Sequence, residues 1–84
     1  MLMISRRPGE RLQIEDVVLT VVRVANGVAE ISLRKRRSAP IVLTLQPEEF
    51  VESCYNVRVG LVNAQRGKAQ LGFDVPEDVK VARL

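Results

Sequence analysis

The sequence predicts a small all-β fold, and three features support that class. Apolar and other residues alternate along most of the chain, and a period of two is typical of strands that bury one face. The dipeptide Asn26-Gly27 separates two such runs, and this pair is the strongest short-range signal of a hairpin turn. The length of 84 residues limits the chain to one compact domain with a thin core.

The expected elements follow closely along the chain. A hairpin spans about 17 to 33, with alternating apolar residues on both sides of its turn. Pro47 and the two carboxylates after it favour the first turn of a helix, and apolar residues come next, so one short helix is expected near 47–53. Such a helix is stable only when it packs on a sheet. Further strands are expected at 41–45, 57–62, 69–73 and 79–83.

An internal repeat accounts for most of these strands. A shift of 40 residues places 17–33 on 57–73 without a gap, and after the next loop a shift of 36 places Pro40 on Pro76. Within a single domain, 1–84, residues 1–53 then form a full copy with the short helix. Residues 54–84 form a truncated second copy that lacks the first strand. The alternative is coincidence, because any two hairpins with alternating apolar residues align in this way.

The composition excludes several classes of function. The chain has no histidine and a single cysteine, Cys54, so imidazole-based catalysis, imidazole-based zinc sites, an internal disulfide and an all-thiolate metal site are all excluded. No nucleophile has an evident neighbouring base, and the five glycines form no phosphate-binding loop. We therefore expect no enzyme activity, no metal and no cofactor. No apolar run is long enough for a signal peptide or a membrane span, which suggests a cytoplasmic protein.

The net charge of +3 is distributed unevenly. Residues 1–37 carry eight basic and four acidic side chains, whereas the remainder carries five basic and six acidic ones. Such asymmetry suggests a polyanionic partner, most often nucleic acid, although a weak excess also occurs on ordinary soluble domains. The densest run consists of Arg34, Lys35, Arg36 and Arg37. It is either a solvated loop or an accessory phosphate contact.

The two ends of the chain resemble one known family. Residues Met1–Glu10 combine an apolar strand, a hydroxyl residue, two arginines and a Gly-Glu turn. This pattern resembles the N-terminal signature of the carbon storage regulator (Csr/Rsm) family, small bacterial RNA-binding proteins that control translation. The match continues through 11–14 and the Asn26-Gly27 hairpin. Independently, residues Gly67–Arg83 look like the family's third and fourth strands, its proline loop and its fifth strand with a terminal arginine.

The resemblance implies both a fold and a binding site. Each unit has five short strands, and two units intertwine so that the first and fifth strands of one join the central three of the other. The RNA site of the family lies where the first strand of one unit meets the fifth strand of its partner, and it recognises a GGA element, usually in a hairpin loop of an mRNA leader. Carried over to this chain, the RNA-binding residues are Ile4, Ser5, Arg6, Arg7, Val75, Pro76, Val81, Ala82 and Arg83.

The repeat and the resemblance together predict one working RNA site. At the position that matches Arg83, the first copy has Pro47, which carries neither a charge nor a backbone donor. The second copy has no counterpart of Arg6 and Arg7. Each copy has thus lost the half of the site that the other has kept. We expect a single-chain pseudo-dimer whose one site combines the first strand of copy one with the last strand of copy two.

Two functions are compatible with these patterns. The first is sequence-specific binding of GGA-containing hairpins in mRNA, or of small regulatory RNAs with that motif, with an effect on translation or mRNA stability. The alternative is a protein-interaction module that pairs with regulators of this type or with their protein antagonists and binds RNA weakly. The three retained arginines favour RNA. Pro47, Ala82 in place of a histidine or polar residue, and Val75 in place of a small residue leave the alternative open. Self-association is also open, because the family is homodimeric and this chain would mimic the dimer.

Overall fold

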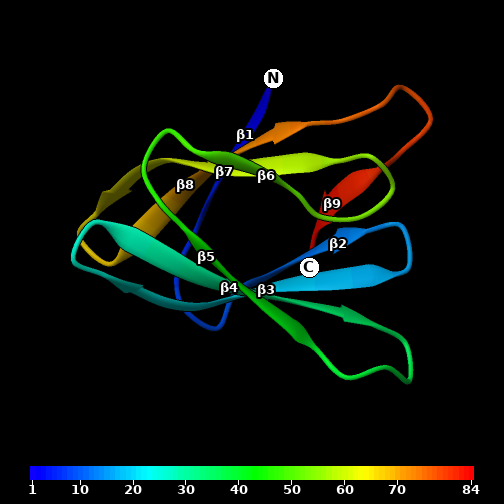
Figure 1. Ribbon diagram of the computed structural model, residues 1–84, viewed down its shortest axis with the longest axis horizontal. Helices are drawn as coiled ribbons and strands as arrows, with labels where there is room; N and C mark the ends of the chain where they lie inside the picture. Colours follow the sequence, from blue (N-terminus) through cyan, green and yellow to red (C-terminus); the bar gives the residue numbers. More distant parts are fainter.

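The computed structural model describes all 84 residues and has an all-β fold, as the sequence predicts. Nine short strands form two antiparallel sheets (Figure 1). One sheet has the strand order β1-β8-β7-β6, and the other has the order β5-β4-β3-β2-β9. The strands are β1 Leu2–Arg6, β2 Arg11–Ile14, β3 Val17–Ala25, β4 Val28–Lys35, β5 Ile41–Leu45, β6 Phe50–Glu52, β7 Arg58–Gln65, β8 Lys68–Asp74 and β9 Val81–Arg83.

The core lies between the two sheets. Sixteen buried apolar side chains form one cluster, and no polar or charged side chain is buried. Across the sandwich, β3 contacts β8 and β4 contacts β7. This stacking puts β1 on the same side of the molecule as β2 and β9, and it puts β6 on the same side as β5. The sandwich therefore has two open edges, one formed by β1 and β9 and the other by β6 and β5.

The two hairpins of the repeat have the same local structure. The β3–β4 turn at Asn26-Gly27 and the β7–β8 turn at Arg66-Gly67 both have two consecutive positive φ values. That conformation matches a type I′ turn, whose twist fits paired strands. Each hairpin also has a register shift, directly after Val21 in the first and after Leu61 in the second. Because Val21 and Leu61 are 40 residues apart, the hairpins repeat in backbone geometry as well as in sequence.

The helix expected near 47–53 is absent. Residues Phe50–Glu52 form strand β6 instead, antiparallel to β7, and Pro47 makes an isolated parallel bridge to Leu61. Glu48 has a φ of +65°, which no right-handed helix accommodates, and its N–H donates to the Leu61 carbonyl at 2.9 Å. A helix of seven residues is marginal on its own. Pairing with β7 satisfies the same backbone groups and extends the sheet.

The strand registers place the boundary between the two copies near residue 41. Ile4 of β1 lies opposite Leu71 of β8, and Leu43 of β5 lies opposite Ile31 of β4. Since Ile31 and Leu71 are equivalent in the two hairpins, β5 has the role in the second copy that β1 has in the first. Likewise, β6 pairs with β7 as β2 pairs with β3. These registers differ from the expected division at 53–54, because they give the second copy five strands and leave the first copy without a fifth.

Three strands cross from one copy to the other. β1 joins β8, β5 joins β4, and β9 joins β2. Each sheet therefore combines the central strands of one copy with strands donated by the other, which is the exchange that a single-chain pseudo-dimer requires. Because the first copy has no fifth strand, β6 has no neighbour on its outer side, whereas its counterpart β2 is covered by β9.

Candidate nucleic-acid interface

Two arginines lie on the core-facing side of the strands that form one open edge. In β1, Ile4 is buried, so Arg6, two residues further on, points to the same side of its sheet. In β9, Arg83 lies opposite the buried Leu12 of β2 and thus also faces the core side. β1 and β9 form the same edge of the sandwich, so the two arginines belong to that edge from different sheets, and Nε of Arg6 donates to the Ser5 carbonyl at 3.0 Å. Neither arginine forms an ion pair.

A tight turn holds the end of β1 close to the end of β9. The Arg7 N–H donates to Oε1 of Glu10 at 2.7 Å, and the Glu10 N–H donates to the Arg7 carbonyl at 3.0 Å. Gly9 has a φ of +89°, which favours glycine, and its N–H donates to a carbonyl of β3 at 2.7 Å. The N–H of Leu84 donates to the Arg11 carbonyl at 3.3 Å. The end of β9 therefore lies beside the residue that follows the arginine turn.

The other predicted residues of β1 and β9 have different environments. Ile4 belongs to the buried core, and Val81 is half-buried against it, so both side chains serve packing. Ser5 and Ala82 are exposed on the outer faces of their sheets, on the opposite side from the two arginines. Arg7 is exposed in the turn after β1. The structure thus brings Arg6 and Arg83 to one edge, with Arg7 nearby, and turns Ser5 and Ala82 outward.

Ser5 lines a small hollow on the outer face of the β1-β8-β7 sheet. The hollow has a volume of about 180 Å³. Its other lining residues are Asn63, Gln65, Lys68 and Gln70. Amide side chains offer both donors and acceptors, which are the groups that pair with base edges in single-stranded RNA. This polar hollow adjoins β1 on the face away from Arg6.

The loop between β8 and β9 contains Val75 and Pro76. Val75 is half-buried and packs against the core, and the carbonyl of Pro76 accepts a hydrogen bond from the N–H of Val79 at 3.1 Å. The loop leaves β8 beside the start of β1, since Leu2 lies opposite Phe73. Most of the length of β1 therefore separates Val75 and Pro76 from the arginine pair. The loop borders the same edge but does not contact the same point.

The opposite edge of the sandwich lacks the equivalent groups. Leu45 of β5 lies opposite Ala29, just as Arg6 of β1 lies opposite Ala69. Leu45 is fully buried and uncharged. The neighbouring strand β6 also lacks the companion that β9 provides for β2. The arrangement of two arginines at an open edge therefore occurs once in the molecule.

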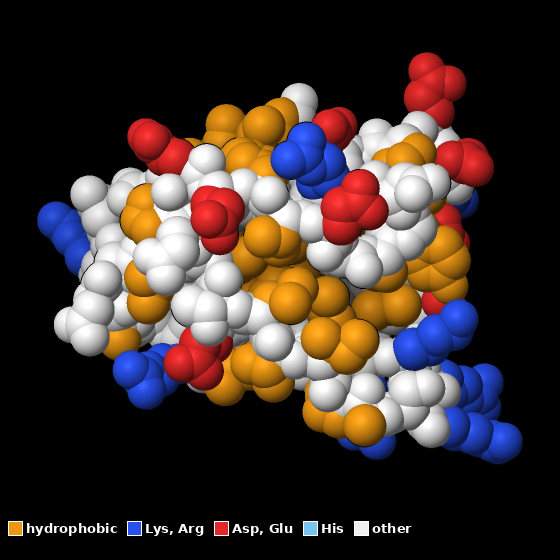
Figure 2. All heavy atoms as spheres, in the orientation of Figure 1, with side chains coloured by type: hydrophobic (Ala, Val, Ile, Leu, Met, Phe, Trp, Pro, Cys, Tyr) orange, Lys and Arg blue, Asp and Glu red, His pale blue; other side chains and the backbone are white.

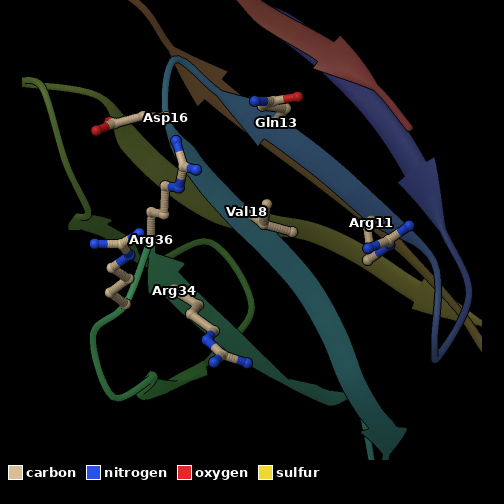
Figure 3. A pocket seen from close by; sticks show the side chains of 7 residues that line it. Arg11, Gln13, Asp16, Val18, Arg34 and Arg36 are labelled. Atoms are coloured by element: carbon tan, nitrogen blue, oxygen red, sulfur yellow. The ribbon is translucent and has the colours of Figure 1, made fainter.

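A second basic surface lies on the outer face of β2, β3 and β4 (Figure 3). It is a cavity of about 540 Å³ lined by Arg11, Gln13, Asp16, Val18, Arg34, Arg36 and Arg37. We call this set the basic groove. In Figure 2, Lys and Arg side chains gather at the lower right, where Figure 1 shows the loop between β4 and β5. Lys35 is outside the groove, and its Nζ lies 3.9 Å from Oδ2 of Asp16.

The sequence patterns did not identify Arg11 and Gln13 as part of this surface. Only the sheet register places β2 next to β3 and brings its outward side chains into line with Arg34 at the end of β4. The available signal was the alternation in β2, in which Arg11 and Gln13 flank the buried Leu12. Local alternation shows that both point outward, but it does not show which residues they meet.

A hydrogen bond joins the β2–β3 turn to the equivalent β6–β7 turn. The Tyr55 hydroxyl donates to Oδ1 of Asp16. This bond raises the pKa of Tyr55 to about 12 and holds the pKa of Asp16 below its usual value. The adjacent Cys54 is half-buried, and burial raises the pKa of its thiol. Since the thiolate is the reactive form, Cys54 is a poor nucleophile near neutral pH.

No protein-family model, curated protein or solved structure matches this chain. Its histidine-free sequence contains no group of three or more cysteine and carboxylate side chains arranged to hold a metal ion. No helical segment has the length and apolar character that a membrane crossing requires. The groups that could contact a ligand at the β1–β9 edge and in the basic groove are guanidinium groups, amide side chains and exposed backbone.

Proposed function

We propose that this chain is an RNA-binding regulator of the carbon storage regulator type, which recognises GGA-containing hairpin loops along its β1–β9 edge. In this role it acts in the cytoplasm on mRNA leaders and alters their translation or stability. The observation that supports the proposal is the placement of Arg6 and Arg83, from opposite ends of the sequence and from different sheets, on the two strands of one open edge.

The groups at this edge suit a splayed RNA loop. β1 and β9 are edge strands, so each presents unpaired backbone N–H and C=O groups that can read base edges. Guanidinium groups bind phosphate through two donors at once and remain charged at any physiological pH. Arg6 and Arg83 have no carboxylate partner that would compete with a phosphate. In this proposal the arginines hold the RNA backbone while the strand edges provide base preference.

A gel shift with a GGA hairpin and a CCA hairpin of equal length tests the proposal. Wild type is expected to prefer the GGA hairpin at near-physiological salt. Arg83→Ala should weaken binding about tenfold or more, because a hydrogen bond to a charged group contributes roughly 1.5–3 kcal/mol. Arg58→Ala, which removes an exposed arginine from β7, is the matched control and should bind as wild type does. Equal binding of both hairpins would leave only nonspecific charge and would contradict the proposal.

The second candidate function is a protein-interaction module, and the β5–β6 edge favours it. β6 has an open outer side, and Ile41 and Val42 of β5 are 63% and 57% exposed. Figure 2 shows hydrophobic side chains near the centre of the view, where Figure 1 places these two strands. An added strand from a protein partner would cover both features. A stable complex with a carbon storage regulator in the absence of RNA, lost in Ile41→Lys, would support this function over RNA binding.

A further inference from the structure

We propose that the basic groove is a second phosphate-binding surface, which holds single-stranded RNA flanking the hairpin loop. The inference rests on the proposed function, since it extends the path of the same RNA. It assigns to the groove the backbone of a flanking segment and leaves base recognition to the β1–β9 edge.

The first observation is an excess of unpaired positive charge around a cavity. Four arginines and one carboxylate, Asp16, line the groove. Asp16 already accepts a hydrogen bond from Tyr55, and its closest basic group is Lys35, which lies outside the groove. None of the four arginines forms an ion pair. Guanidinium donors crowded without counter-charges repel one another, and a polyanion placed among them relieves this repulsion.

The second observation is a continuous row of side chains from the β1–β9 edge to the groove. Ala82 of β9 lies opposite Gln13, Gln13 opposite Val18, and Val18 opposite Arg34. Gln13, Val18 and Arg34 point outward beside buried neighbours in their strands, and Ala82 shares their face because it lies opposite Gln13. The row crosses three strand spacings, about 14 Å in total. A few nucleotides of extended RNA that leave the edge at Ala82 can therefore reach the arginines at the end of β4.

The lining of the groove favours a phosphodiester chain over an apolar ligand. Val18 is its single apolar residue, whereas pockets for drug-like ligands are lined mostly by apolar side chains. Gln13 lies between the edge and the arginines and offers donors and an acceptor to a ribose 2′-hydroxyl or a base edge. Arg36 and Arg37 belong to the β4–β5 loop, so their side chains can adjust to a flexible strand.

Affinity measurements on three RNAs test the inference. The first RNA is a minimal GGA hairpin, and the other two carry a single-stranded extension of several nucleotides at the 5′ or the 3′ end. We expect one extension to tighten binding to wild type about tenfold in moderate salt. Arg34→Ala combined with Arg36→Ala should abolish this gain, lower the salt slope by about 1.4 and leave binding of the minimal hairpin unchanged. Arg58→Ala is the control and should keep the gain.

The outcomes separate this inference from the proposed function. Tight binding of the minimal hairpin without any gain from either extension would overturn the inference alone, and so would a gain that survives the double substitution. If the minimal hairpin does not bind, the proposed function fails. A titration with an oligouridine then shows separately whether the groove binds single-stranded RNA. Shifts of the Gln13 and Val18 amide resonances with oligouridine, larger than those with equimolar inorganic phosphate, would support it. No shift, or equal shifts, would overturn it.

Discussion

Arg6 and Leu45 occupy equivalent places in the two copies of the repeat, and the difference between them decides which edge can bind an anion. Both follow the same alternation in an edge strand, and each lies opposite an alanine of the exchanged hairpin. Arg6 is partly exposed, whereas Leu45 is buried. A core-facing position at the end of an edge strand can therefore serve either packing or binding. The residue type at that one position determines which of the two it serves.

The single tyrosine allows the contact between the two equivalent turns to be titrated. The Tyr55 phenol donates to Asp16, so the tyrosinate absorbance of the folded protein should have a midpoint near 12. Asp16→Asn removes the negative charge and should bring the midpoint down toward the ordinary value of about 10. An ultraviolet pH titration measures both, and the chain has neither tryptophan nor a second tyrosine to interfere. Identical midpoints in the two proteins would contradict this contact.

The Tyr55–Asp16 hydrogen bond should stabilise the fold only within a limited pH range. The pKa of Tyr55 is raised on folding, so its contribution is present below the ordinary tyrosine pKa and is lost as the pH rises toward 12. The pKa of Asp16 is lowered on folding, so its contribution is present above the ordinary carboxyl pKa and is lost as the pH falls through the lowered value. The difference in urea midpoint between wild type and Asp16→Asn should therefore be greatest from mildly acidic to mildly alkaline pH.

At the scale of elements, Phe50 holds the short strand β6 on its sheet. An added Cβ at Gly60 of β7 would lie 2.7 Å from ring carbons of Phe50, and one at Gly72 of β8 would lie 3.1 Å from the far end of the ring. Gly60→Ala should therefore destabilise the protein by roughly 1–3 kcal/mol through overpacking. Urea unfolding followed by circular dichroism measures this cost. In a Phe50→Leu background the cost should be smaller, and an equal cost in both backgrounds would refute the contact.

Local signals predict the hairpin turns, and pairing between strands explains what those signals miss. Asn26-Gly27 specifies its turn through the φ values of two adjacent residues, so the sequence alone is sufficient there. The segment 47–53 carries helix signals, but Phe50–Glu52 pair with the next strand, β7, and so form a strand. The register of β5 against β4, which moves the copy boundary to about 41, likewise depends on how two strands pair and not on the residues of β5 alone.

For the candidate site, too, the sequence predicts some features and only the topology shows the others. Only the family resemblance predicts that Arg6 and Arg83 belong to one edge, because alternation and charge do not show which strands exchange. The basic run at 34–37 was visible as a charge pattern. This run and Arg11 line the same groove because β2 and β4 flank β3, and no local sequence pattern shows that strand order. Sequence therefore identified most of the charged residues, and topology determined their neighbours.

At the scale of the whole molecule, both sheets are completed by strands of a single chain, and this arrangement predicts the stoichiometry. All three exchanged pairings, of β1, β5 and β9, are made within the chain, so no second chain is needed to complete a sheet. Only one edge has arginines on both of its strands, because Leu45 replaces Arg6 at the other edge and no fifth strand accompanies β6. We therefore expect a monomer that binds one GGA hairpin.

Light scattering measures the number of chains in the free protein and the number of RNA hairpins bound per chain in the complex. RNA is supplied well above the dissociation constant. The free protein should have the mass of one chain, and the complex should contain one protein and one RNA. Arg83→Ala should reduce the bound fraction without changing the mass of the free protein, because the Arg83 side chain is exposed and lies outside the buried core. A free protein with twice that mass would contradict this stoichiometry, because a second chain would then pair either by exchange of β9 or along the open β5–β6 edge. Two hairpins per monomer would require an anion site at the β5–β6 edge, and there Leu45 leaves no charge at the position that Arg6 fills on β1.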